Sequence, residues 1–342
     1  MKTRATALAA AFALAAVPAS AEGKLNLYNW GDYINPEVLD RFAEEFGVDV
    51  SLDTYSSNEE MLAKIQSGAT GYDIIFPSVH MQDIMHTLNL LEKTDINEHP
   101  DFANIDPDSL LAKTDPNGEY CLPYAWGTVG IVYNKTLVPE LSSWEEFFAI
   151  PETTGARITL LDDMREVMAI GLVMTGHSVN STDPEAIQQA TDYLIAHKPD
   201  VSAFTYDTQA LIASGDIAAG HFFVGVNILV KEQPETLAYT IPAEGATMYQ
   251  ENACVLASAP NKENARKFLE FYLRPEIAAL NVAQQMNGTP NIPARALTPD
   301  YIKEDPNINL SSETMARLEM FEELGNAIRL YDRAWNRVRT AQ

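Results

Sequence analysis

The stretch "KLNLYNWGDYINPEVLDRFAEEFGVDVSLDTYSSNEEMLAKIQSG", residues 24–68, alternates between strand and helix patterns. Residues 24–30 and 48–55 have the apolar and aromatic content of strands. Asn35 followed by Pro36 is typical of a helix start, and "SNEEMLAKIQSG" predicts a capped helix that ends at Gly68. The short apolar run "YDIIFPS" then predicts a third strand. Such repeated strand–helix–strand units predict an α/β fold with a mostly parallel sheet covered by helices.

The same alternation returns between about residues 156 and 248, in "RITLLDD", "EVMAIGLVMTG", "PEAIQQATDYLIAHK", "IAAGHFFVGV" and "LAYTIPAEG". Between the two α/β regions lies "LPYAWGTVGIVYNK", an extended apolar run with two glycines. We interpret this run as chain that crosses from one lobe into another. "ENACVLAS" predicts a further strand, and the rest of the chain is predicted to be mainly helical.

The first 21 residues have the pattern of a secretory signal peptide. Lys2 and Arg4 precede an apolar run of small residues that ends in Ala19-Ser20-Ala21, an A-x-A cleavage site. This run is too short to span a membrane, and no Cys follows the cleavage site to carry a lipid. We therefore expect a periplasmic protein that does not insert into the membrane. The remaining 321 of 342 residues would fill about two domains.

Charge restricts the class of ligand. Removal of Lys2 and Arg4 with the signal changes the formal net charge from −25 to −27. An acidic surface of this kind repels nucleic acid and anionic lipid, and it raises the local concentration of cationic small molecules. Solubility alone would also explain such a charge.

Cys121 and Cys254 are the two cysteines of the chain. An oxidising compartment would allow a disulfide between them. Both lie in segments predicted as strands, so two separate buried thiols fit the pattern equally well.

Motifs of common enzyme classes are missing. The sequence has no G-x-S-x-G, Walker, G-x-G-x-x-G or H-E-x-x-H motif. Its six histidines lack the spacing of metal ligands. We therefore expect no catalytic residue, no metal site and no cofactor.

Carboxylates next to aromatic residues recur instead at predicted strand ends, where ligands of α/β proteins bind. They are Asp32 between Trp30 and Tyr33, Asp162, Asp163 and Glu166 after "RITLL", and Glu251 after Tyr249. Carboxylates beside aromatic rings are the groups that bind an organic ammonium ion. Each charge-assisted hydrogen bond to a carboxylate contributes ~1.5–3 kcal/mol, and each ring adds ~0.5–2 kcal/mol. We expect Asp32 to hold an amine while the neighbouring rings cover a methylene chain.

From about Leu25 to Arg339 the chain resembles the periplasmic polyamine-binding proteins, the spermidine and putrescine receptors of ABC importers. The stretches that carry the resemblance are "LYNWGDYI", "SNEEMLAKIQSGATGYDIIFPS", "DPNGEYCLPYAWGTVGIVYN", "LLDDMREV", "IPAEGATMYQENACVLASAPNKENARKFLEFYLRP" and "RAWNRVR". The resemblance implies a two-lobed type II binding protein whose lobes are joined by crossing hinge strands. Each lobe would be a mixed, mainly parallel sheet flanked by helices.

The resemblance also implies a set of ligand-binding residues: Trp30, Asp32, Tyr33, Ser78, His80, Asp163, Glu166, Phe223, Tyr249, Glu251, Asn287 and Phe321. Several of these depart from the family pattern. His80 and Phe223 stand where relatives carry an aromatic and a Trp, and Glu251 replaces the usual Asp. Val226 occupies a position that can hold an Asp, and Asn287 and Phe321 replace Tyr-like and Gln-like residues. These changes favour a ligand that is shorter than spermidine, or less charged at one end.

The leading hypothesis is a monomeric receptor that delivers a polyamine to an inner-membrane ABC permease. Lobe 1 would comprise residues 22–128 and 250–295, and lobe 2 residues 129–249 and 296–342. One alternative keeps the fold but binds another amine or an amino-acid derivative. Another is a secreted hydrolase that uses Asp163 and Glu166 as its acid and base.

Overall fold

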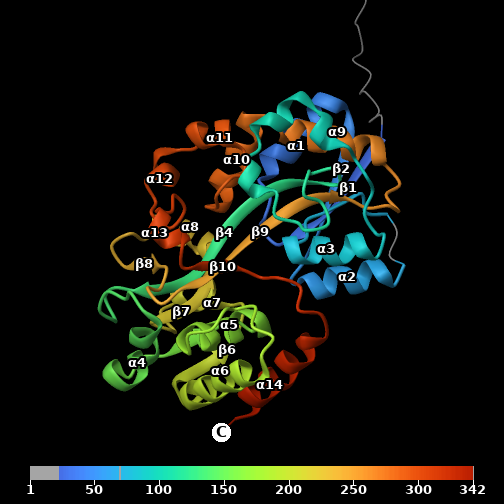
Figure 1. The fold of residues 1–342 in the computed structure, drawn as a ribbon. Helices are drawn as coiled ribbons and strands as arrows, with labels where there is room; N and C mark the ends of the chain where they lie inside the picture. Colours follow the sequence, from blue (N-terminus) through green and yellow to red (C-terminus); the bar gives the residue numbers. More distant parts are fainter. Residues whose placement is uncertain (1–22, 69–70, 342) are drawn as a thin grey trace, which may run out of the picture.

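The computed structural model describes residues 23–68 and 71–341, so the predicted signal peptide lies outside the described residues. Figure 1 shows an upper and a lower part of the molecule joined by two long strands, β4 and β9. The upper part begins with β1 (Gly23–Trp30), α1 (Pro36–Phe46), β2 (Val48–Tyr55), α2 (Asn58–Gln66), β3 (Ile74–Ile75) and α3 (Val79–Thr87). Strand β1 pairs in parallel with both β2 and β3, which confirms the predicted strand–helix–strand units.

The helix starts follow the local sequence signals. The Asn35 side chain accepts a hydrogen bond from the backbone N–H of Glu37, and Pro36 occupies the first turn of α1. The Ser57 side chain accepts a hydrogen bond from the backbone N–H of Glu60 at the start of α2. These contacts satisfy backbone donors that a helix leaves unpaired at its first turn.

The lower part continues the alternation with α4 (Trp144–Thr154), β5 (Ile158–Leu160), α5 (Met164–Met174), α6 (Pro184–His197), β6 (Val201–Phe204), α7 (Thr208–Ala213), β7 (Ala219–Phe223), α8 (Asn227–Glu232) and β8 (Leu237–Thr240). The tail contains α9 (Lys262–Tyr272), α10 (Pro275–Gln285), α11 (Ile292–Leu297), α12 (Asp300–Lys303), α13 (Ser312–Met315), β10 (Leu318–Met320) and α14 (Ile328–Thr340). Short 3-10 helices are η1 (Ile96–Glu98), η2 (Pro100–Asn104), η3 (Pro107–Ser109), η4 (Lys198–Asp200), η5 (Val224–Val226) and η6 (Gly325–Ala327). The mainly helical tail is confirmed, but the sequence did not predict β6 or β10.

The sheets of the two parts share one strand. Strands β4 (Cys121–Asn134) and β9 (Ala246–Val255) run antiparallel to each other. The strand order is β2-β1-β3-β9-β4-β7-β5-β6, with β10 beside β9 and β8 beside β4. The shared strand β4 therefore connects the upper and lower parts.

Buried apolar residues form three clusters. The first contains residues between Leu25 and Ala125 together with residues between Ala253 and Ala294. The second and third begin on β4 at Ile131 and Val132 and include residues of the lower part. We call the part around the first cluster lobe 1 and the part around the other two lobe 2. Because β4 contributes to all three clusters, it carries the chain from one lobe to the other.

Cys121 and Cys254 form a disulfide in lobe 1 that spans 133 residues of chain. They occupy directly opposite positions on β4 and β9, and both are buried. The bridge therefore joins the two crossing strands inside lobe 1, at the end of the strand pair that is farther from lobe 2.

Two further properties concern the part of the chain described, residues 23–68 and 71–341. None of its helices is both long enough and apolar enough to cross a membrane. Nor does it contain a group of three or more His, Cys, Asp or Glu side chains placed to hold a metal ion.

Candidate functional site

Five of the predicted ligand-binding residues form one hydrogen-bond network: Tyr33, Ser78, Tyr249, Glu251 and Asn287. The Tyr33 hydroxyl donates to Glu251 Oε2 (2.7 Å), and Ser78 Oγ donates to Glu251 Oε1 (3.3 Å). Asn287 Nδ2 donates to the Tyr33 hydroxyl (2.9 Å), and the Tyr249 hydroxyl donates to Asn287 Oδ1 (3.2 Å). The fold thus brings together residues from the loop after β1, the start of α3, strand β9 and the chain after α10.

Backbone contacts hold this network in place. The carbonyl of Tyr33 accepts hydrogen bonds from the Tyr124 hydroxyl (2.5 Å) and from Gln285 Nε2. Ser78 forms an isolated antiparallel bridge with Glu251. Its Oγ also accepts a hydrogen bond from Asn58 Nδ2 (2.9 Å), which leaves the Ser78 hydroxyl proton to point at the carboxylate. Asn58 was missed because at the start of α2 it has no sequence signal beyond that of a helix terminus.

Glycine is required where Tyr249 lies against β4. A Cβ atom at Gly127 would collide with the Tyr249 ring and with the Val224 side chain. The Phe223 ring in turn meets the Tyr249 ring edge-on, with 5.6 Å between the ring centres. The glycine therefore lets an aromatic pair pack directly onto a crossing strand.

Glu251 is a buried carboxyl without a cationic partner. Only 4% of its surface is exposed, and burial raises its pKa to about 8 even though the hydrogen bonds from Tyr33 and Ser78 favour the charged form. No ion pair among the described residues includes Glu251. An ammonium group placed beside it would offset the cost of keeping this carboxylate charged in the interior.

Trp30 and Asp32, which the sequence places after the first predicted strand, differ in their surroundings. The Trp30 indole N–H donates to the carbonyl of Phe76 (2.8 Å), and its ring packs on Tyr55 at 4.7 Å. Asp32 is exposed and has a φ of 55°, in the left-handed region. The sequence predicted that Asp32 would hold an amine, but Glu251 is the carboxyl that the fold buries among polar and aromatic side chains.

A second acidic group lies between the lobes. Asp163 caps α5: its Oδ1 accepts hydrogen bonds from the backbone N–H groups of Arg165 (2.8 Å) and Glu166 (3.0 Å). Its Oδ2 accepts a hydrogen bond from the Tyr206 hydroxyl (3.1 Å). Burial, and then the charge of Asp163, raise the pKa of Glu59 on α2 in lobe 1. The charge of Asp163 in lobe 2 therefore acts on Glu59 in lobe 1. Sequence reasoning missed Glu59 and Tyr206 because nothing in the sequence brings either of them near Asp163.

His80, Arg165 and Phe321 meet where the tail passes between the lobes. The Arg165 guanidinium lies 4.3 Å from the centre of the Phe321 ring, and the His80 ring meets that ring edge-on at 6.4 Å. Burial and then the Arg165 charge lower the pKa of His80 to about 4, so His80 is neutral at pH 7. Asn180 binds this tail segment through hydrogen bonds to the Met320 carbonyl (2.8 Å) and from the Glu322 N–H (2.8 Å). Phe321 is thus attached to lobe 2 and touches lobe 1.

One ion pair also joins the lobes at this point. Lys113 Nζ of lobe 1 lies 2.7 Å from Glu322 Oε2 in the tail segment, and both side chains are more than half exposed. We expect the charge reversals Lys113→Glu and Glu322→Lys each to weaken ligand binding by up to about fivefold, because an exposed pair contributes ~0.2–1 kcal/mol. The double variant Lys113→Glu/Glu322→Lys should restore affinity, measured by titration calorimetry at low salt. If the double variant is as weak as the two losses combined, the pair does not hold the two lobes together.

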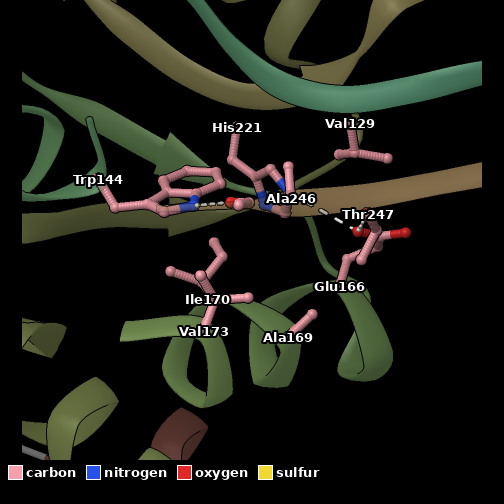
Figure 2. Close-up of a pocket in the computed structure, with 10 residues that line it drawn as sticks. Val129, Trp144, Glu166, Ala169, Ile170, Val173, His221, Ala246 and Thr247 are labelled. Carbon is pink, nitrogen blue, oxygen red and sulfur yellow. Dashed lines mark hydrogen bonds and ion pairs between the residues drawn. The ribbon is translucent and has the colours of Figure 1, made fainter. Parts of the chain in front are cut away.

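Glu166 lies apart from the other predicted ligand-binding residues. Figure 2 shows its side chain pointing toward Thr247 and His221 inside lobe 2. Its Oε2 accepts a hydrogen bond from Thr247 Oγ1 (2.6 Å). These groups line a cavity of about 10 Å³, the size of one water molecule. The sequence placed Asp163 and Glu166 together as an acidic pair, but their side chains make different contacts.

Comparisons with known proteins agree with this geometry. A family model described as bacterial extracellular solute-binding protein matches residues 37–309. The spermidine/putrescine-binding periplasmic protein of Escherichia coli is 32% identical over 339 residues, which cover 98% of this chain and 97% of that protein. The putrescine-binding periplasmic protein SpuD of Pseudomonas aeruginosa is 30% identical over 98% of this chain and 97% of its own length. A solved structure described as a putative spermidine/putrescine ABC transporter from Listeria monocytogenes superimposes with a TM-score of 0.85 at 33% identity, covering 93% of this chain and 99% of that one.

Proposed function

The chain belongs to the bacterial extracellular solute-binding proteins, and from this premise we propose that it captures a polyamine between its two lobes and delivers it to an ABC permease. Its fold is the two-lobed type II binding-protein fold of its structural neighbours. The ligand would be a putrescine-like or spermidine-like cation. Relatives that cover nearly the whole chain carry names with these two ligands.

The observation that carries the proposal is the buried Glu251 network. Glu251 accepts hydrogen bonds from Tyr33 and Ser78 and lies beside the rings of Tyr33 and Tyr249, with no cationic side chain paired to it among the residues described. A primary ammonium would supply the missing positive charge, and the aromatic rings would cover the adjacent methylene groups. Asp163 and Glu59 would attract a second positive charge at the interface of the lobes.

Closure follows from contacts made to both lobes at once. Glu251 lies on the lobe 1 part of β9, whereas Asp163 caps a helix of lobe 2. A ligand that touches both carboxyls stabilises the closed arrangement because only that arrangement offers both contacts. We place the lobe boundaries at residues 128/129, 249/250 and 295/296. Apart from Met286, which packs in the third cluster, the distribution of the three apolar clusters supports this division.

The proposed setting is the periplasm, with the protein acting as a monomer. The periplasmic relatives and the signal-like residues 1–21 support export, and the acidic surface favours a cationic small molecule over nucleic acid. The role is binding without chemical change, as for the transporter components that the chain resembles. Recovery of an intact polyamine after long incubation would rule out the hydrolase alternative.

One alternative has support from the structure, a different amine on the same fold. Val226 is fully buried in the third apolar cluster, and Phe223 and Phe321 add apolar wall near the carboxyls. A ligand with one ammonium and a neutral end would match this distribution. Mass spectrometry of the ligand that co-purifies with the protein would identify it.

Titration calorimetry with putrescine, cadaverine, spermidine and agmatine tests the proposal. We expect at least one of them to bind with a Kd well below about 1 mM, which corresponds to −4.1 kcal/mol. n-Butylamine, which has one charge, is the matched control and should bind more weakly than putrescine. Failure of all four compounds to bind below millimolar concentration contradicts the polyamine assignment.

A further inference from the structure

We propose that helix α10 positions the ligand network by holding Tyr33 at both ends of the residue. Asn281 and Gln285 on α10 bind the backbone of the loop that carries Tyr33, and Asn287, just beyond α10, binds the Tyr33 hydroxyl. Asn281 and Gln285 are then positioning residues, which act on the ligand through Tyr33. This inference deepens the proposed function, on which its ligand part rests.

The loop between β1 and α1 is attached to one face of α10, which lies beside α1 in lobe 1 (Figure 1). The backbone N–H of Asn35 donates to Asn281 Oδ1 (2.9 Å), and Asn35 Nδ2 donates to the carbonyl of Leu280 (3.0 Å). Gln285 Nε2 donates to the carbonyl of Tyr33. Because residues four apart on a helix share a face, Asn281 and Gln285 hold the loop side by side.

Hydrogen bonds inside lobe 1 fix the orientation of the Asn281 amide. A backbone N–H can only donate, so the Asn281 oxygen faces Asn35, and its NH2 group donates to the hydroxyls of Tyr124 (2.8 Å) and Tyr272 (2.9 Å). The Tyr272 hydroxyl donates in turn to the carbonyl of Tyr124 (3.2 Å). The Tyr124 hydroxyl therefore directs its own proton to the carbonyl of Tyr33 (2.5 Å).

Asn281 and Gln285 have no donor left for a ligand. Both N–H bonds of the Gln285 amide are used, by the carbonyl of Tyr33 and by the Tyr124 hydroxyl (3.2 Å). Asn281 is fully buried, Gln285 is 3% exposed, and neither side chain carries a charge that would attract an ammonium. The contacts of both residues are therefore those of a support for Tyr33.

The chain turns sharply at Met286, directly after α10. Met286 has a φ of 54°, in the left-handed region, and its side chain is 3% exposed in the third apolar cluster. In a continued helix the side chains of Gln285 and Asn287 would point ~200° apart around the axis. The turn instead lets Asn287 Nδ2 donate to the Tyr33 hydroxyl (2.9 Å) while Gln285 holds the carbonyl of the same residue.

The position of Tyr33 decides its contact with Glu251. The Tyr33 hydroxyl donates to Glu251 Oε2 over 2.7 Å. A shift of about 1 Å would lengthen this contact beyond hydrogen-bond range. Burial raises the pKa of Tyr33 well above its ordinary value, so the hydroxyl keeps the proton that it donates. Support of the loop by α10 therefore reaches the counter-charge of the ligand through Tyr33.

A double-mutant cycle tests whether Gln285 acts through Tyr33. Gln285→Met removes both donors at similar size, so it should weaken putrescine binding about fivefold, as loss of one hydrogen bond does. Tyr33→Ala removes the side chain that is being positioned. In that background Gln285→Met should change the Kd by less than about twofold.

Titration calorimetry gives the four values of Kd in this cycle. If the two losses add in the double variant, Gln285 contacts the ligand directly and the proposal is wrong. It is also wrong if Gln285→Met alone binds like the wild type. Gln284→Met is the matched control, because it makes the same change at the exposed neighbouring residue of α10, and it should bind putrescine as the wild type does.

Amide hydrogen exchange tests the support of the loop without a ligand. The amide of Asn35 should exchange about fivefold faster in Gln285→Met, because the loop opens more easily, while amides of α6 in lobe 2 keep their wild-type rates. Asn281→Leu removes the acceptor of this amide and should accelerate its exchange further. Unchanged exchange of Asn35 in Gln285→Met overturns the proposal, even if Asn281→Leu does not fold. If no polyamine binds the wild type, the proposed function fails while this measurement still decides whether α10 holds the loop.

Discussion

Glu251→Gln is expected to weaken polyamine binding by about 100-fold, or roughly 3 kcal/mol, the lower end of the cost of breaking a buried ion pair. The substitution removes the charge that would face the ammonium while preserving the shape of the side chain. The amide oxygen can accept from one of the two hydroxyls, Tyr33 or Ser78, and the amide NH2 can donate to the other, so the network should persist after the second hydroxyl turns. Titration calorimetry at pH 8 measures the change in Kd.

Glu44→Gln is the matched control for this experiment. Glu44 is an exposed acid on α1 of lobe 1, so its substitution removes the same charge from the same lobe at a distant surface. The Glu44→Gln variant should bind the polyamine with the same affinity as the wild type. Equal losses in the two variants would mean that the overall acidity of the protein attracts the ligand and that Glu251 does not bind it.

The pKa of Glu251 adds a pH dependence to the same prediction. Because this pKa is about 8 without ligand, Glu251 must release a proton when it pairs with an ammonium at pH 7. Affinity should therefore increase about tenfold from pH 6 to pH 7 and level off above pH 8. Glu251→Gln should show no such slope. A wild-type Kd that is constant from pH 6 to pH 8 would contradict the role of Glu251 as counter-charge.

Removal of the disulfide is expected to have the largest effect on stability. The bridge between Cys121 and Cys254 closes a loop of 133 residues, and loss of a native disulfide that closes a long loop costs about 2–5 kcal/mol. The double variant Cys121→Ala/Cys254→Ala should therefore melt roughly 5 °C or more below the wild type, since 1 kcal/mol shifts the melting temperature by ~2–4 °C in proteins of 150–250 residues and by less in a larger chain. Differential scanning calorimetry gives this difference.

A reducing agent provides an internal control for the disulfide. Wild-type protein that is unfolded in dithiothreitol, so that the bridge is reduced, and then refolded should melt near the temperature of the double variant. The same treatment should leave the melting temperature of the double variant unchanged. Polyamine affinity below the melting range should be retained, because neither cysteine belongs to the Glu251 network. Identical melting curves with and without reductant would contradict the bridge.

Local patterns were sufficient for the elements that begin the chain. Asn35-Pro36 and Ser57 form helix caps because a capping side chain needs only its own next few residues. In contrast, β10 has three residues, Leu318–Met320, and no strand pattern of its own. It exists as a strand because the tail is brought beside residues 246–248 of β9. Such pairing depends on the path of the whole chain.

In the candidate site, too, some features follow from the sequence and others depend on the path of the whole chain. The carboxylate–aromatic pattern and the family resemblance together named Tyr33, Ser78, Tyr249, Glu251 and Asn287, which the fold joins in one network. They could not distinguish the exposed Asp32 from the buried Glu251, since both are acids within two residues of a tyrosine in sequence. They also missed Glu59, whose closeness to Asp163 exists only across the lobes.

The sequence by itself therefore determined the α/β alternation, the helix starts, the crossing run and the residue types available to bind a cation. Tertiary structure alone decided that the two cysteines pair, that Glu166 turns toward Thr247 and that Glu251 is left without a cation. The reason is physical: caps and amphipathic faces depend on neighbours within one or two turns, whereas burial and the charge state of a carboxyl depend on all groups that surround it. Those groups come from segments far apart in the sequence, such as Tyr33 and Glu251, which are 218 residues apart.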